Sequence, residues 1–148
     1  MVDITHESLG HLRRLFISLP APDTLTGVYR AEFVGPAWLR ALEPPSLALG
    51  GLAGWWGKAF DDRGRAINIV VSEGNQRRVL PMTIARGPSL IDGVTGFTLG
   101  YPKGAPFPWP WVVDEVRRLD EQTLLCMTLV KSKSLSQLAF PFALHSHS

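Results

Sequence analysis

Short strand-forming segments follow one another through most of the chain, and this spacing constrains its fold more than any other feature. They cover about residues 25–34, 53–60, 66–73, 77–86, 94–101, 111–118, 122–130 and 138–144. Turn-forming residues join several of them, including Asp61–Gly64, Glu73–Asn75 and Asp92–Gly93. Connections this short predict antiparallel neighbours in one sheet.

A sheet of this kind belongs either to a sandwich or to a closed barrel. Closure removes the exposed edge strands, and strands in simple succession favour an up-and-down topology. The chain has 148 residues, of which 45% are hydrophobic and 19% charged, enough for one real core. We therefore predict a mostly β fold: an antiparallel, calycin-like barrel of about eight strands with an N-terminal α-helix, forming a single domain over residues 1–148.

The segment before the first strand has helical periodicity. Its apolar residues recur at helical spacing: Leu9, Leu12, Leu15, Phe16 and Leu19. Asp3 or Thr5 can cap the start and Pro20 stops the pattern, which predicts a helix over about residues 4–18. That helix can close one end of the barrel or pack against its outside. A second, single helical turn is expected over Pro36–Leu42, ended by Glu43 and two prolines.

Composition and charge exclude several classes of binding partner. The formal net charge of +2 is scattered along the chain, without the basic stripe that nucleic acid requires. No apolar stretch approaches the length of about 18 residues that a membrane span needs. The single Cys126 cannot form an internal disulfide and is expected to be a buried, hydrophobic thiol. We predict a cytoplasmic monomer or homodimer that binds neither nucleic acid nor membrane and uses no cofactor.

Two separated stretches resemble the GXWXG family of small bacterial proteins and the domain that usually follows it in those chains. The family's W-Y-G-K-x-F stretch is similar to Trp55–Phe60, with tryptophan where tyrosine is usual. Its late segment, D-x-x-R followed by an acidic turn and T-L-L-G-x-M, is similar to Asp114–Arg117 and Asp120–Met127. The naming motif is altered at Gly27–Ala31, where Tyr29 replaces the tryptophan and Ala31 the second glycine.

The function of that family is unassigned, so the resemblance implies a fold and names no ligand. A glycine and an aromatic residue on the first strand are also similar to the short signature of lipocalin-type barrels. That second resemblance implies an internal ligand cavity.

Asp114 and Arg117 are the strongest candidates for chemistry. A carboxylate and a guanidinium inside a poorly hydrated cavity can orient a polar ligand end or move a proton. Regular strand alternation places Asp114 and Val116 on one face and Glu115 and Arg117 on the other, so a direct Asp114–Arg117 pair requires a bulge. A structural ion pair or a solvated face is the alternative.

Other candidates lie on the first two strands. Tyr29, Ala31 and Phe33 share one face of the first strand, and Arg30 on the other face meets either a polar cavity or water. Trp55 and Trp56 point to opposite faces, so one packs in the core and the other lines a pocket or lies under the helix. Lys58 binds an anion or lies along the surface.

The remaining aromatic and histidine residues suggest less. The segment Tyr101–Trp111 alternates prolines with aromatic rings and is either a lid or a rigid connector over the core. His145 and His147 fall in a tail that is expected to fray, and His6 and His11 are spaced too widely to share one helical face. No metal site is predicted.

Three functions remain open. The first is a binder of a small, mostly hydrophobic ligand, such as a fatty acid, terpenoid, steroid or polyketide-like molecule, in the barrel interior. Its apolar contacts would be Tyr29, Trp55, Trp56 and Met127, and its polar contacts Arg30, Lys58, Asp114 and Arg117. The second is a cofactor-free cyclase, isomerase or hydratase in which Asp114 or Tyr29 is the acid or base. The third is an interaction domain whose barrel is filled by its own side chains.

Overall fold

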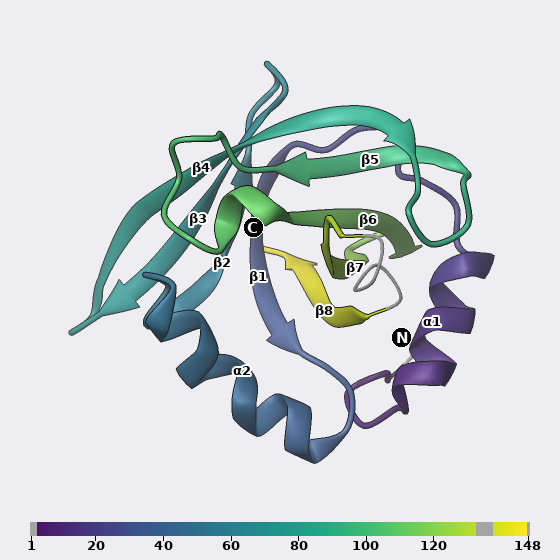
Figure 1. Ribbon diagram of the computed structural model, residues 1–148, viewed down its shortest axis with the longest axis horizontal. Coiled ribbons are helices and arrows are strands. Elements are labelled where there is room, and N and C mark those ends of the chain that lie inside the picture. The colour runs from purple at the N-terminus through teal and green to yellow at the C-terminus, as the bar shows by residue number, and fades with distance from the viewer. Residues whose placement is uncertain (1–2, 133–137, 148) are drawn as a thin grey trace.

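The computed structural model describes residues 3–132 and 138–147, and in this part of the chain eight strands close into one antiparallel barrel (Figure 1). Each strand pairs with its neighbours in sequence, and β8 closes the barrel by pairing with β1. The strands are β1 Gly27–Phe33, β2 Trp55–Phe60, β3 Arg65–Ser72, β4 Asn75–Pro88, β5 Thr95–Gly100, β6 Val112–Asp120, β7 Thr123–Val130 and β8 Ala139–Ser146. The predicted antiparallel up-and-down barrel of about eight strands is confirmed.

The turns form where the sequence predicts them. Asp61 accepts the backbone N–H groups of Arg63 and Arg65 through Oδ1, at 2.8 and 3.0 Å, and so folds the β2–β3 connection. Glu73 and Gly74 both have positive φ, 52° and 80°, which matches the right-handed twist of the β3–β4 hairpin. Local turn geometry therefore supports the antiparallel hairpins β2–β3 and β3–β4.

Two bulges interrupt the regular register. Leu80, with φ of 52°, is the extra residue where β4 faces Ile67 and Asn68 of β3. Trp56 is the extra residue on β2, because Trp55 pairs with Val70 while Gly57 pairs with Ile69. An extra residue shifts the alternation by one position, so that residues three apart across the bulge point to the same face, which matters for the cavity described below.

Alternation along β7 divides the apolar residues into two layers. Leu124 and Cys126 point into the barrel and join its internal core, whereas Leu125 and Met127 point outward. The helix α1 (Leu9–Ser18) covers this outer layer with two fully buried side chains and packs against β8. Of the two predicted places for the helix, the outside of the barrel is the one observed (Figure 1).

The start of α1 differs from the prediction. The helix begins at Leu9 and is capped by Ser8, whose Oγ accepts the His11 N–H at 3.1 Å. Asp3 and Thr5 do not cap it, since Asp3 accepts the N–H of Thr5 and the Thr5 hydroxyl donates to Glu32. Residues 4–8 are therefore non-helical chain.

The second helix, α2 (Ala37–Leu49), is longer than the predicted single turn. It continues through Pro44 and Pro45, both of which are exposed. Just past the prolines, the Ser46 hydroxyl donates to the Leu42 carbonyl at 2.8 Å, one turn back along the helix. The expectation that the prolines end the helix was wrong because the far side of α2 packs over the barrel.

The expectation of a frayed C-terminal tail was also wrong. β8 runs to Ser146, and the His147 N–H still donates to the Val28 carbonyl at 2.9 Å. His145 Nε2 lies 2.9 Å from Glu32 Oε1, and the His147 ring meets Trp56 edge to face at 4.9 Å. Both histidines therefore belong to the seam that closes the barrel.

Candidate functional site

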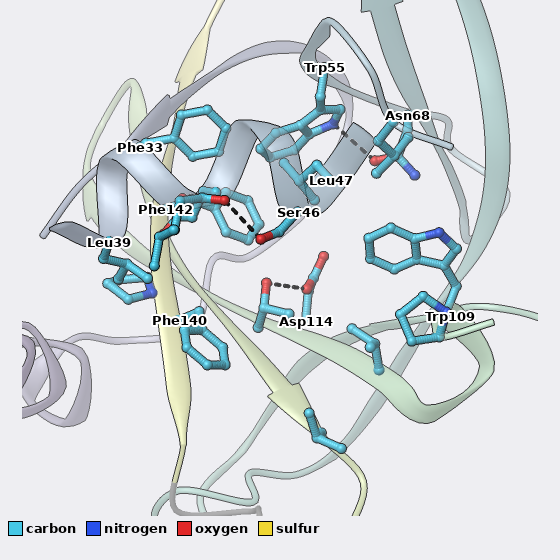
Figure 2. A pocket seen from close by; sticks show the side chains of 18 of the residues that line it. Phe33, Leu39, Ser46, Leu47, Trp55, Asn68, Trp109, Asp114, Phe140 and Phe142 are labelled. Atoms are coloured by element: carbon cyan, nitrogen blue, oxygen red, sulfur yellow. Dashed lines mark hydrogen bonds between the residues drawn. The ribbon is translucent and has the colours of Figure 1, made fainter. Parts of the chain in front are cut away.

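A cavity of about 370 Å³ lies in the barrel beneath α2, within the range of about 300–1,000 Å³ typical of small-molecule sites. Its walls are mainly aromatic and aliphatic, and Figure 2 shows several of these side chains around one common space. They include Phe33, Leu47, Trp55, Trp109, Phe140 and Phe142. The barrel is therefore only partly filled by its own side chains.

One wall belongs to α2. Leu39, Glu43, Ser46 and Leu47 repeat at the spacing of one helical face and all line the cavity. Trp38, at the start of the same helix, also lines it and is 56% exposed, so the cavity reaches the surface beside α2.

The Pro-rich segment between β5 and β6 supplies another wall. Trp109, in the short 3-10 helix η1 (Trp109–Trp111), is buried against Tyr101 and donates its indole N–H to the Gly50 carbonyl. A Cβ at position 50 would lie 2.7 Å from the Trp109 ring, which explains the glycine there. The segment is thus tied to the end of α2.

The deepest part of the cavity is polar and is formed by Lys58, Asn68, Tyr101 and Asp114, here called the polar floor. Lys58 is 1% exposed, and its Nζ donates to Asn68 Oδ1 at 2.7 Å. The same Nζ lies 3.3 Å from Asp114 Oδ2 and 3.2 Å from the Met82 sulfur. A buried ammonium with a carboxylate and an amide oxygen beside it is well compensated.

The bulge at Trp56 brings Trp55 and Lys58 into the same cavity. Three positions apart on a regular strand, the two side chains would point to opposite faces. With Trp56 as the extra residue, both point inward, and the Lys58 ammonium lies 5.5 Å from the centre of the Trp55 ring.

Asn68 connects the floor to its surroundings. Its Oδ1 also accepts the Trp55 indole N–H at 3.1 Å (Figure 2). Its Nδ2 donates to the Leu80 carbonyl and the Tyr101 hydroxyl, each at 3.0 Å. Sequence reasoning did not select Asn68 or Tyr101. The available signal was a lone asparagine within the apolar run Ala66–Val71.

Asp114 is 4% exposed and is held on both sides. Its Oδ1 accepts the Thr128 hydroxyl at 2.8 Å, and its Oδ2 faces Lys58. Burial has the largest effect on the pKa of Lys58 and alone would lower it, but Tyr101 and Asp114 outweigh burial and raise the pKa above its ordinary value. Burial raises the pKa of the Tyr101 phenol. At neutral pH the floor therefore contains an ammonium ion and a neutral phenol.

Five of the predicted site residues do not line the cavity: Arg117, described below, and four others. Tyr29 points into the barrel but packs edge to face on Phe60, with ring centres 5.5 Å apart. Arg30 is exposed, and Trp56 contacts His147. Met127 is buried in the layer under α1. Among the predicted residues, the structure brings together Trp55, Lys58 and Asp114.

Arg117 is also separated from Asp114, as strand alternation requires. Its guanidinium pairs with both carboxylate oxygens of Asp92 at 2.7 and 2.8 Å and donates to the Phe16 carbonyl at 2.8 Å. These contacts fasten the end of α1 and the β4–β5 turn to β6. Cys126 is fully buried, and burial raises its thiol pKa well above the ordinary value, as expected of a hydrophobic thiol.

The Asp92–Arg117 pair predicts a pH-dependent stability. Hydrogen bonds from Arg117 hold the pKa of Asp92 at about 2, so its contribution is present above about pH 4 and lost as the pH falls toward 2. Asp92→Asn should lower the free energy of unfolding at neutral pH by about 2 kcal/mol. It should also reduce the loss of stability between about pH 4 and pH 2, here called the acid limb. Urea unfolding at several pH values measures both effects, with the exposed Asp62→Asn as control. An unchanged acid limb in Asp92→Asn would contradict the assignment.

The described residues contain no group of three or more His, Cys, Asp or Glu side chains placed to hold a metal ion. None of the helices in that part of the chain is long and apolar enough to cross a membrane.

Comparison with known proteins identifies a related fold. A scan against protein families finds no match for this sequence, and a search of curated proteins finds none either. The barrel is similar to the crystal structure of a protein from Thermomonospora curvata, with a TM-score of 0.72 and 18% sequence identity. The match covers 97% of this chain and 90% of the other. This likeness shows the fold.

Proposed function

We propose that this protein binds a small, mostly hydrophobic ligand inside the barrel, with one polar end of the ligand on the polar floor. The observation that carries the proposal is an apolar cavity that ends on the buried Lys58–Asp114 pair. A buried ion pair contributes little net stability compared with apolar residues of the same size. Such a pair at the end of an otherwise apolar cavity is therefore better explained by binding than by packing.

The charges on the floor favour a neutral polar group. Lys58 and Asp114 balance each other, and an additional carboxylate would be desolvated next to Asp114. The Tyr101 hydroxyl accepts from Asn68 and can donate its own hydrogen, while Asp114 retains free lone pairs. A ligand hydroxyl can satisfy both. Among the predicted ligands, oxygenated terpenoids, steroids and polyketide-like molecules thus fit better than a fatty acid.

The two sequence stretches that resemble the GXWXG family meet at this floor. Lys58 belongs to Trp55–Phe60 and Asp114 opens the late segment, and their charged groups are 3.3 Å apart. We therefore also propose a distant relationship to that family.

Filling the cavity tests the proposal. Leu47→Trp should place an indole inside the cavity and weaken the binding of the neutral fluorophore phenylnaphthylamine at least tenfold, equal to about 1.4 kcal/mol. Leu49→Trp makes the same change on the same helix at a side chain that is 92% exposed, and it should bind like wild type. Equal binding by all three proteins, or none by wild type, would refute an internal site. If Leu47→Trp alone weakens binding, native mass spectrometry of protein purified from its own host can identify a retained ligand.

A second candidate is a cofactor-free cyclase, isomerase or hydratase that uses the same cavity. The observation that favours it is the Asp114 carboxylate, which is 4% exposed and faces an apolar space where a proton acceptor is little hydrated. Asp114→Asn, followed for both ligand affinity and product formation, separates the two functions. Loss of turnover with retained binding indicates catalysis, and loss of binding alone indicates carriage.

A further inference from the structure

Glu43 presents a second polar group to the cavity, on the wall formed by α2. It lies on the helical face that carries Leu39 and Leu47, and it lines the cavity with them. Its Oε1 is buried and has no hydrogen-bond partner within residues 3–132 and 138–147. A buried acid oxygen without a hydrogen-bond partner costs free energy. Because this oxygen belongs to a side chain that lines a cavity, its position indicates that a ligand group supplies the missing hydrogen bond.

The charged groups nearest to Glu43 along α2 and on the polar floor are paired with residues other than Glu43. Arg40, one turn earlier on α2, donates to the Gly35 carbonyl at 3.0 Å and lies 2.9 Å from His6 Nδ1. On the strands, Lys58 and Asp114 pair with each other beside Tyr101. Burial, without an offsetting charge among the described residues, raises the pKa of Glu43 to about 8. At neutral pH Glu43 is thus chiefly a carboxylic acid, which can both donate and accept a hydrogen bond.

The two polar groups lie on different elements and differ in exposure. Lys58 and Asn68 on the floor are 1% and 0% exposed, whereas Glu43 lies on α2 next to the exposed Leu42. Most of the other side chains that line the cavity are apolar. A ligand with a single polar end can form hydrogen bonds with only one of these two groups.

We propose that Glu43 is a ligand contact, and that the ligand carries neutral oxygen groups at both ends, one on the polar floor and one on the Glu43 carboxyl group. This inference rests on the proposed function and adds the second end to it. The chemical class is a long, apolar molecule with two terminal hydroxyl or carbonyl groups.

Matched probes test the second end. Terminal diols from octanediol to tetradecanediol are compared with the single alcohols of the same length as competitors of phenylnaphthylamine. Because a second hydroxyl favours water, an apolar site binds the diol more weakly than the alcohol. A hydrogen bond between the second hydroxyl and the Glu43 carboxyl group should reverse this order. The best diol should then bind about threefold to tenfold more tightly than the alcohol of the same length.

Two variants assign the effect to Glu43. Glu43→Leu should abolish the diol preference, so that each alcohol binds more tightly than the diol of the same length, and Glu43→Gln should retain the preference. A diol preference that survives Glu43→Leu, or that wild type lacks, would overturn the inference. Failure of the proposed function gives a different result, since neither phenylnaphthylamine nor the alcohols would then bind.

The pH dependence provides a second readout. Diol affinity of wild type should fall as the pH rises through about 8, where Glu43 loses its proton, and Glu43→Gln should show no such fall. Without ligand, a pKa raised from 4.5 means that wild-type stability decreases progressively between about pH 4.5 and 8. Thermal melts should show this decrease in wild type and not in Glu43→Gln. Parallel curves for the two proteins would contradict the burial of the acid.

Discussion

Replacing Lys58 with methionine is expected to lower the free energy of unfolding by about 3–5 kcal/mol, because it leaves the Asp114 carboxylate buried without its cation. Asp114 would keep only the Thr128 hydroxyl, and Asn68 Oδ1 would lose its 2.7 Å donor. Urea unfolding followed by circular dichroism measures the loss. Lys103→Met, at an exposed lysine, is the matched control and should be close to neutral.

Removing both charges should restore most of the stability. The double variant Lys58→Met with Asp114→Leu replaces the pair with apolar side chains, which often equal or exceed a buried ion pair in stability. The same variant should lose affinity for hydroxylated ligands while it still binds phenylnaphthylamine. If the double variant is as unstable as the single one, the pair contributes to folding in a way that the proposed function does not require.

Gly57→Ala is expected to destabilise the barrel by about 3 kcal/mol or more. A Cβ at this position would lie 1.9 Å from the Tyr29 carbonyl oxygen, a backbone atom of the paired strand that cannot rotate away. Relief of the clash requires β1 and β2 to separate beside the Trp56 bulge, which would also displace Trp55 and Lys58 from the cavity.

The matched control for this change is Gly87→Ala, also in a strand, where an added Cβ meets nothing within 4 Å. Thermal unfolding and phenylnaphthylamine binding should both fall for Gly57→Ala and remain near wild type for Gly87→Ala. A Gly57→Ala protein with normal stability would show that the bulge can relax without consequence.

The barrel could be predicted because its information is local. Turn residues such as Asp61 and Gly74 fix the hairpins, and alternation assigns Asp114 and Arg117 to opposite faces without knowledge of the rest of the fold. The length of α2 could not be predicted, because packing over the cavity outweighs the local effect of Pro44 and Pro45. The predicted caps, Asp3 and Thr5, lie before the observed cap Ser8, because residues 4–8 are held in non-helical chain by contacts such as that of Thr5 with Glu32.

The candidate site was less accessible to sequence reasoning. Trp55, Lys58 and Asp114 were selected by residue type, but their meeting depends on a bulge that strict alternation would forbid. Asn68, Tyr101 and Glu43 were missed because each comes from a different part of the chain. Only barrel closure and the position of α2 bring these groups to one cavity.

The tryptophans of the cavity have a practical consequence. Trp38, Trp55 and Trp109 all line it, whereas Trp56 lies on the outside against His147. A molecule that enters would exchange the surroundings of several indole rings at once. The unlabelled protein therefore carries its own optical reporter of occupancy, and shifts in its intrinsic emission can be used to screen compound libraries without a dye.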